Sequence, residues 1–300
     1  MKRRQFISTG IKAGIVAGMV PVVSAGHQQQ KPFDLVAVKG GEPGAMFDMA
    51  IRSLGGLSAF VMKGQTVLVK PNIGWDAPPE RAANTNAGLV KKIVALCVQQ
   101  GAKKVIVFDK TCNDWNKCYK NSGIQQAVTS AGGIMLPGNS EQNYKPVTIP
   151  GAVKLKGVKV HEAYISADVI INVPVLKHHS GTTLTIGMKN LMGVVWDRWF
   201  WHEHDLHRCI AEFVLYRKPT LNVVDAHRVI MRNGPRGVSV EDVTEMNSLI
   251  VSRDIVAADA AATKLFGKEP DEIGHIKIAH NLKLGSMLLD KLNIDRIKMG

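Results

Sequence analysis

Several short runs of Val, Ile and Leu in this sequence end in polar residues of the kinds that carry chemistry. In an open α/β sheet, ligands bind in the crevice outside the carboxyl ends of the strands. If these runs form neighbouring parallel strands, the polar residues that follow them line one crevice. The residues that this arrangement would gather are Lys70, Asn72, Asp109, Lys177, His178, Asp225 and Asp254.

Three basic residues are the candidates for acid–base catalysis. Lys70 leaves an apolar run just before Pro71, which restricts the lysine to an extended conformation. A lysine held in this way binds a carboxylate or phosphate, or acts as a base or nucleophile where burial lowers its pKa. Histidine is the side chain whose ordinary pKa lies closest to neutrality, which makes His178 a second candidate. We therefore predict that Lys70, His178 and Lys189 serve as acid, base or anion clamp.

Residues 177–193 are the densest polar stretch of the chain and predict a binding loop. Backbone amides near Gly181 and Thr182, at an expected helix start, could hold an oxyanion or phosphate; the alternative is a solvated surface loop. Asp254 also has a structural alternative, because it precedes a helical run and is a candidate N-cap. The residues predicted to bind a cofactor or ligand are Asn72, Asp109, Lys177, Asn190 and Asp225, where the two aspartates orient the basic groups or hold a metal.

Residues 196–207 are rich in both aromatic residues and histidine. His204 and His207 are three positions apart, so on one helix they share a face and could coordinate one metal ion. Together with His178 and His179, they are the predicted metal ligands. The alternative for this segment is an aromatic lid or a partner surface.

The four cysteines include no Cys-x-x-Cys pair, which disfavours an iron–sulfur cluster held by this chain alone. The sequence identifies no particular cofactor, and a metal ion is one candidate. In an oxidising compartment Cys112 and Cys118 could close a small disulfide loop. Cys97 lies on the apolar face of an expected helix, where we expect a small buried hydrophobe.

Apolar runs alternate with amphipathic stretches along the chain, which is typical of an α/β fold with a mostly parallel sheet. Fully apolar runs such as residues 105–107 indicate that helices cover both faces of the sheet. Residues 31–300 are predicted to form a single α/β domain, in which the irregular segment 138–160 is an inserted hairpin or a soft boundary. The predicted strands are Leu35–Val38, Thr66–Val69, Lys104–Phe108, Val169–Val173, Leu221–Val224 and Leu249–Ser252, and the predicted helices are Ala87–Gln100, Ile124–Ala131, Leu206–Leu215, Val256–Phe266 and Ile273–His280.

The first 30 residues have the three parts of a signal peptide: a basic head, a short apolar stretch and small residues at a cleavage site. The paired Arg3 and Arg4, followed by Phe6 and Ile7, indicate the twin-arginine route. The apolar stretch is too short for a spanning helix, which needs roughly 20 apolar residues, so no transmembrane anchor is expected after processing. We expect the twin-arginine translocase as a partner and a protein that is periplasmic or otherwise exported.

The formal net charge of +13 at pH 7 suits a small anionic ligand. The basic residues are scattered, and they form no zinc-finger spacing, basic helix or aromatic RNA-binding signature. Nucleic acid is therefore not an expected partner.

Five strings in the sequence resemble the domain of unknown function family 362, in that family's order, over about residues 64–285. Many members carry fused ferredoxin-type cysteine motifs, which imply redox work, and this chain departs from them by lacking those motifs. The resemblance therefore implies a separate redox protein as a partner instead of an intrinsic cluster. The layout is also similar to that of the nickel-pincer lactate racemases. The five strings are Val67–Asn72, Ala167–His179, Met188–Gly193, Asn233–Gly237 and Asp254–Asp259.

Two functional hypotheses from different classes follow. The first is an exported enzyme, dependent on a cofactor or metal and of redox or isomerase type, that acts on a small anionic substrate. The second is a non-catalytic periplasmic binding protein that holds an anionic ligand with the same positive residues.

Overall fold

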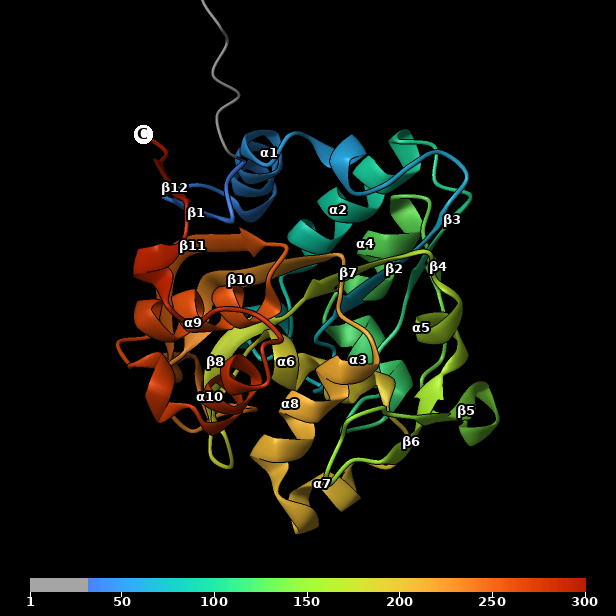
Figure 1. The fold of residues 1–300 in the computed structure, drawn as a ribbon. Coiled ribbons are helices and arrows are strands. Elements are labelled where there is room, and N and C mark those ends of the chain that lie inside the picture. The colour runs from blue at the N-terminus through green and yellow to red at the C-terminus, as the bar shows by residue number, and fades with distance from the viewer. Residues whose placement is uncertain (1–31) are drawn as a thin grey trace, which may run out of the picture. The chain divides into compact units, whose positions relative to one another are not determined.

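The apolar runs of the sequence form the strands of one mixed sheet in the computed structural model, which describes residues 32–300. The main path of the sheet is β12–β1–β11–β10–β7–β2–β3–β4, with β8 beside β10 and β9 beside β8 (Figure 1). A separate two-stranded sheet contains β5 and β6. The strands are β1 (Leu35–Lys39), β2 (Thr66–Pro71), β3 (Lys104–Val107), β4 (Ile134–Met135), β5 (Tyr144–Thr148), β6 (Gly157–His161), β7 (Val169–Val173), β8 (Val175–His179), β9 (Thr183–Thr185), β10 (Leu221–Ile230), β11 (Val243–Ser252) and β12 (Ile294–Lys298).

Most neighbouring strands of the main sheet are parallel, which confirms the predicted α/β class and mostly parallel sheet. The exception along the main path is β11, which is antiparallel to both of its neighbours, β1 and β10. The six predicted strands correspond to β1, β2, β3, β7, β10 and β11. The last two are 10 residues long and extend well beyond the predicted runs.

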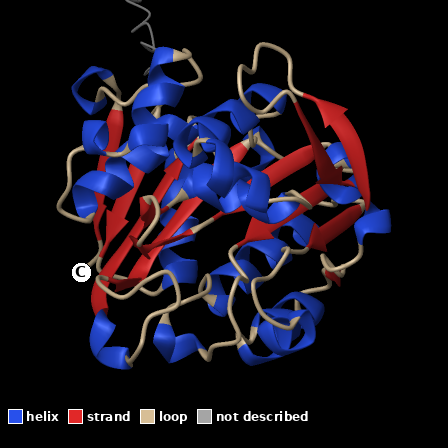
Figure 2. Cartoon of the chain, turned by 90° about the horizontal axis from the view of Figure 1, so that it is seen from below, coloured by secondary structure: helices blue, strands red, loops and turns tan. Residues whose placement is uncertain are grey.

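Helices cover both faces of the sheet, because side chains that alternate along each strand enter two separate cores. In β2, Val67 and Val69 belong to a core with α1, α2, α3 and α4, whereas Leu68 belongs to the opposite core. Figures 1 and 2 show helices on either side of the strands. The helices are α1 (Pro43–Ser53), α2 (Ala87–Gln99), α3 (Trp115–Asn121), α4 (Ile124–Ser130), α5 (Glu162–Ser166), α6 (Gly187–Asn190), α7 (Trp199–His204), α8 (Leu206–Tyr216), α9 (Ile255–Leu265) and α10 (Gly274–Asn281).

The described residues form one unit. Within the predicted irregular segment 138–160, β5 begins an antiparallel hairpin with β6, which ends at residue 161. The signal peptide predicted at residues 1–30 lies outside the described residues. Within the described part of the chain, no helix is long and apolar enough to cross a membrane.

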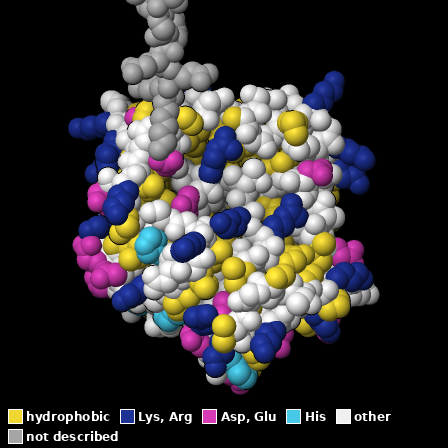
Figure 3. Space-filling model, in the orientation of Figure 1, with side chains coloured by type: hydrophobic (Ala, Val, Ile, Leu, Met, Phe, Trp, Pro, Cys, Tyr) yellow, Lys and Arg dark blue, Asp and Glu magenta, His cyan; other side chains and the backbone are white. Residues whose placement is uncertain are grey.

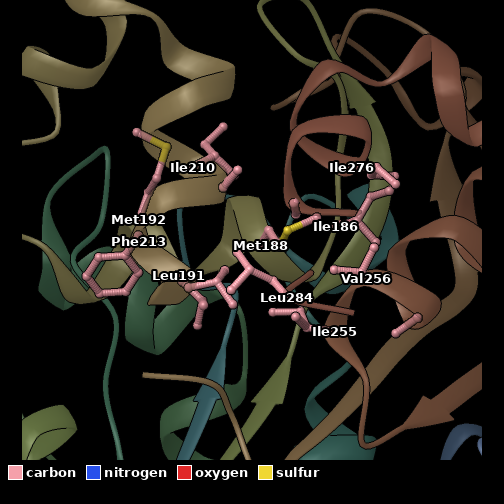
Figure 4. Close-up of a cluster of buried hydrophobic side chains, with 14 of the residues drawn as sticks. Ile186, Met188, Leu191, Met192, Ile210, Phe213, Ile255, Val256, Ile276 and Leu284 are labelled. Atoms are coloured by element: carbon pink, nitrogen blue, oxygen red, sulfur yellow. The ribbon is translucent and has the colours of Figure 1, made fainter. Parts of the chain in front are cut away.

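The short helix α6 is anchored in the core formed with α8, α9 and α10 (Figure 4). Buried side chains on and beside α6 pack against these three longer helices, so the backbone of this single turn is held in place. The carboxylate of Asp259, from α9, also accepts hydrogen bonds from the backbone N–H groups of Gly187 and Met188 at 2.7 and 2.9 Å. The buried residues of this cluster are Ile186, Met188, Leu191, Met192, Ile210, Phe213, Ile255, Val256, Ile276 and Leu284.

Candidate active site

A pocket of about 670 Å³ lies at the carboxyl ends of β2 and β3 and beside β8. Segments that follow β2 and β3, the β8–β9 hairpin, α6 and α7 supply its wall. Its volume falls within the range of roughly 300–1,000 Å³ that is usual for small-molecule sites. The residues that line it include Asn72, Asp109, Lys110, Lys177, His179, Lys189, Asn190, Gly193, Trp196, Asp197, Arg198, Trp199 and His202.

Lys177 is a lysine of the pocket wall whose side chain is almost completely buried, with 1% of its surface exposed. Its Nζ donates to Asn72 Oδ1 at 3.1 Å and to the carbonyl oxygen of Ala83. Both acceptors are neutral, and no carboxylate of the described residues forms an ion pair with this lysine. Burial therefore lowers the pKa of Lys177 to about 7.

Lys189 projects from α6 into the same pocket. Its Nζ lies 3.1 Å from the Sδ atom of Met192. Burial, with the positive charge of Arg198 as a second cause, lowers the pKa of Lys189 to about 8. Burial thus moves the pKa values of both lysines of the wall toward neutrality.

Lys70 and Asp109 form a buried ion pair beneath the pocket, with 2.9 Å between Lys70 Nζ and Asp109 Oδ1. Lys70 is fully buried and does not line the pocket, whereas Asp109 does. Burial lowers the pKa of Lys70, and the charge of Asp109 acts in the opposite direction. Gly193 permits this arrangement, because a Cβ atom there would lie 1.8 Å from Asp109 Oδ1. Lys70 therefore supports the pocket floor from below.

A row of asparagines connects the pocket to the centre of the sheet. Asn72 Nδ2 donates to Asn190 Oδ1 at 3.2 Å, and Asn190 Nδ2 donates to Asn172 Oδ1 at 2.9 Å. Asn172 Nδ2 donates to Asn222 Oδ1 at 3.2 Å, and Asn222 Nδ2 donates to the carbonyl oxygen of Ser252 at 3.4 Å. Every amide in the row points the same way, and the row begins at the oxygen that accepts from the Lys177 ammonium group.

His179 adds an uncharged donor to the pocket wall. Burial and the nearby Lys189 and Lys177 lower the pKa of His179 to about 3, so the ring is neutral at neutral pH. Its Nδ1 accepts a hydrogen bond from the Gly181 N–H at 2.9 Å. The ring proton therefore resides on Nε2.

The pocket wall carries four lysine and arginine side chains, Lys110, Lys177, Lys189 and Arg198, and two acidic ones, of which Asp109 is paired with Lys70. On the face shown in Figure 3, Lys and Arg side chains are spread over many separate places. The basic residues of the pocket wall are therefore a local group and not part of a wider basic surface. Such a group is suited to an anionic ligand.

Besides Lys70, which lies beneath the pocket, three of the residues predicted to line one crevice lie elsewhere. His178 alternates with Lys177 and His179 along β8, and its Nδ1 accepts from the Gly234 N–H at 3.1 Å outside the pocket. Asp225 lies within β10, where its carboxylate accepts from the N–H groups of Asn86 and His227. Asp254 caps α9, as its structural alternative predicted.

The predicted metal site is not formed. Asp205, in the left-handed backbone region at φ 100°, separates α7 from α8, so His204 and His207 lie on different helices. The ring of His204 stacks on Phe200, whereas His207 Nδ1 lies 3.2 Å from the Nδ1 atom of His275. No three His, Cys, Asp or Glu side chains within residues 32–300 come together as a metal site, so the predicted set including His178 and His179 is wrong.

Two possibilities that the sequence left open are not found in the described residues. Gly181 and Thr182 lie in the turn between β8 and β9, not at a helix start, and the first amides of α6 are already bound by Asp259. Cys112 and Cys118 are free thiols, so they form no disulfide. The prediction of a buried Cys97 is confirmed.

Sequence reasoning missed part of the pocket wall. Arg198 donates to the carbonyl oxygens of Lys110 and Thr111, both at 2.9 Å, which fixes α7 beside the segment after β3. Trp196 and Trp199 line the pocket, so part of the aromatic segment that the sequence singled out forms a wall. The only sequence signal for this role was the density of aromatic residues.

The fold and the site together define an α/β protein with a basic, lysine-bearing pocket at the carboxyl edge of a mostly parallel sheet. The chain belongs to the family described as Domain of unknown function (DUF362), whose family model matches residues 67–264, and this confirms the resemblance found in the sequence. A relative, the "Thylakoid-associated protein sll1697" of Synechocystis sp. (strain ATCC 27184 / PCC 6803 / Kazusa), is 27% identical over 239 residues, which cover 74% of this chain and 70% of the relative.

Among solved structures, the chain is similar to the lactate racemase apoprotein from Thermoanaerobacterium thermosaccharolyticum, with a TM-score of 0.47 and 9% sequence identity. The similarity covers 85% of this chain and 58% of the racemase chain, so the protein spans little more than half of that structure.

Proposed function

We propose that this protein is an enzyme that moves a proton on a small anionic substrate, with Lys177 as the base and Lys189 as the acid. The observation that carries the proposal is the environment of Lys177, a buried lysine in a pocket wall with two neutral acceptors and no carboxylate partner within the described residues. A neutral lysine has two N–H bonds and one lone pair. When both N–H bonds are used by Asn72 and Ala83, the lone pair is left to take a proton.

The second lysine supports the same chemistry. The positive charge of Lys189 contributes to the lowered pKa of Lys177, so the two ammonium groups disfavour one another. With pKa values of about 7 and about 8, the state with Lys177 neutral and Lys189 protonated is well populated between those pH values. Such a pair provides one base and one acid in a single site.

The remaining groups of the wall would bind and orient the substrate. The guanidinium group of Arg198, with its planar fork of N–H donors, is suited to a carboxylate or phosphate group. The His179 ring contributes a neutral N–H donor. Two indole rings, Trp196 and Trp199, border the pocket and would limit access of water.

Proton exchange tests the proposal whatever product the reaction forms. The protein is incubated in D₂O with a panel of small 2-hydroxy and 2-oxo carboxylates, and NMR follows the loss of C–H signals. We expect exchange with a pH optimum between about 7 and about 8, because it needs Lys177 neutral and Lys189 charged. Lys177→Met should abolish the exchange, and Lys264→Met, a change of an exposed lysine on α9, should not.

The panel also separates this proposal from a binding role. If carboxylates bind in the pocket, as shown by shifts of protein signals, but no ligand exchanges a proton or changes chemically, the enzyme proposal is wrong. The protein is then a binding protein for an anion.

We also propose export by the twin-arginine route, which rests on the residue pattern of the first 30 residues. Fractionation of cells that express the full chain should place it outside the cytoplasm, and Arg3→Lys with Arg4→Lys should retain it inside. Export of the double variant through the general secretory route would contradict this proposal.

A further inference from the structure

A second cavity, of about 990 Å³, lies between the β5–β6 hairpin and α7, and the proposed function does not use it. Apolar side chains from the hairpin and from α7 form much of its wall, among them Val147, Val158, Phe200 and Trp201. Val147 and Val158 face each other as a cross-strand pair. The ion pair between Glu141 and Lys159 also borders this cavity, and both of its side chains are about half exposed, so the charges lie toward solvent.

The second cavity shares part of its wall with the pocket that contains Lys177 and Lys189, the lysine pocket. Lys110, Trp196 and Asp197 line both spaces. Lys110 Nζ lies 4.4 Å from the centre of the Trp196 ring, so these two side chains form a partition held by a cation–π contact. A partition of two side chains, unlike one of backbone, can shift by rotamer changes when a ligand crosses it.

The helix α7 is a common wall of the two spaces. Trp199 and His202, three positions apart and therefore on one face, line the lysine pocket. Phe200 and Trp201 line the second cavity. This short helix thus borders both spaces, with Trp199 and His202 toward the lysine pocket and Phe200 and Trp201 toward the second cavity.

We infer that the site takes an elongated amphipathic anion, whose carboxylate or phosphate head occupies the lysine pocket and whose apolar, ring-bearing tail occupies the second cavity. The inference rests on the proposed function for the placement of the reacting head. It adds the class of the ligand, because a basic compartment and an aromatic compartment share one wall. A small hydrophilic anion would leave the second cavity without a role.

Calorimetric titration of the protein with a series of carboxylates tests this inference. The probes are butanoate, 4-phenylbutanoate and 8-phenyloctanoate, which share the head and differ in the tail. Each buried methylene group strengthens binding by about fourfold, so we expect 8-phenyloctanoate to bind at least about tenfold more tightly than butanoate. Lys189→Met should weaken the binding of all three probes, because it removes a positive charge from the pocket that holds the head.

Variants of the hairpin locate the tail. Val158→Phe places a larger side chain where the tail would pack in the second cavity, so it should reduce the gain of 8-phenyloctanoate over butanoate and leave butanoate binding unchanged. Val147→Phe, on the opposite strand, is an independent variant with the same expected result. Val153→Phe is the matched control, because Val153 is 61% exposed and lines neither space.

Equal affinities for the three probes would overturn the inference, as would hairpin variants that weaken butanoate as much as 8-phenyloctanoate or that change neither. The result is separable from the proposed catalysis. Tail-dependent binding without proton exchange would support the ligand class and remove the enzyme proposal. Exchange of short carboxylates without any benefit from a tail would do the reverse.

Discussion

The substitution Asn72→Asp tests the physical basis of the proposed base most directly. It keeps the shape of the side chain but places a negative charge where Lys177 Nζ now meets a neutral amide oxygen at 3.1 Å. Two unit charges at that distance attract by about 5 kcal/mol if the effective dielectric constant is about 20. The cost of burying the new carboxylate offsets part of this attraction. With about 1.4 kcal/mol for each pKa unit, we expect the pKa of Lys177 to rise by about 2 or more.

The assay is an NMR titration of protein labelled with ¹³C and ¹⁵N in lysine. The Lys177 signals are assigned by their absence from the Lys177→Met variant. In the wild-type protein they should titrate at a pH of about 7, and in Asn72→Asp well above it. Asn281→Asp, an exposed change of the same charge at the end of α10, is the control and should leave the titration unchanged.

A Lys177 that titrates in the wild-type protein at the ordinary pH of a lysine would refute the reasoning, because burial would then not disfavour its charge. A lowered pKa that Asn72→Asp does not raise would refute the assigned contact with Asn72. Proton exchange should fall in Asn72→Asp at neutral pH, since a charged Lys177 has no lone pair to accept a proton.

Three further predictions concern residues that support the site and the histidines first expected to bind a metal. Gly193→Ala should lower the free energy of unfolding by about 1–3 kcal/mol in urea titrations, because the new Cβ would overlap Asp109; unchanged stability would contradict the tight approach. Burial raises the pKa of Asp259 to about 7, so the folded state holds a proton that the unfolded state releases above about 4. Between these pH values the unfolding free energy should fall as pH rises, by about 4 kcal/mol at most, and Asp259→Asn should flatten this dependence; equal slopes would refute the linkage. Elemental analysis of protein purified without chelators should give the same metal content for wild type and for His204→Ala with His207→Ala, and a loss of one metal per chain would restore the histidine site.

The expectation that ligands bind outside the carboxyl ends of strands correctly gave Asn72, Asp109 and Lys177. The polar residues at or after the ends of β2, β3 and β8 lie at one edge of the sheet. This expectation failed for Asp254 because β11 is antiparallel to its neighbours, and its carboxyl end therefore lies at the opposite edge. The apolar pattern of a strand buried on both faces does not reveal its direction. The failure for Asp225 has another cause, since β10 continues to Ile230 instead of ending before the aspartate.

The period of a strand explains the outcome for the histidines of β8. Successive side chains point to opposite faces, so Lys177 and His179 reach the pocket and His178 does not. This could have been predicted, had residues 177–179 been expected to be extended. The roles of Arg198 and Asp259 could not, because each depends on contacts between segments far apart in the sequence, with the segment after β3 and with α6 respectively.

In the asparagine row that begins beside Lys177, each NH₂ group donates to the next member of the row, toward Ser252. The carbonyl oxygen of Ser252 can only accept a hydrogen bond, so Asn222 must turn its NH₂ group toward it, and each following amide must then turn the same way. A single amide cannot flip without leaving two oxygens or two NH₂ groups face to face. Aligned dipoles also polarise one another, so the oxygen presented to Lys177 is more negative than that of an isolated amide. The protonation of Lys177 is thereby coupled to the carbonyl group of Ser252 in β11, at the far end of this chain of aligned hydrogen bonds.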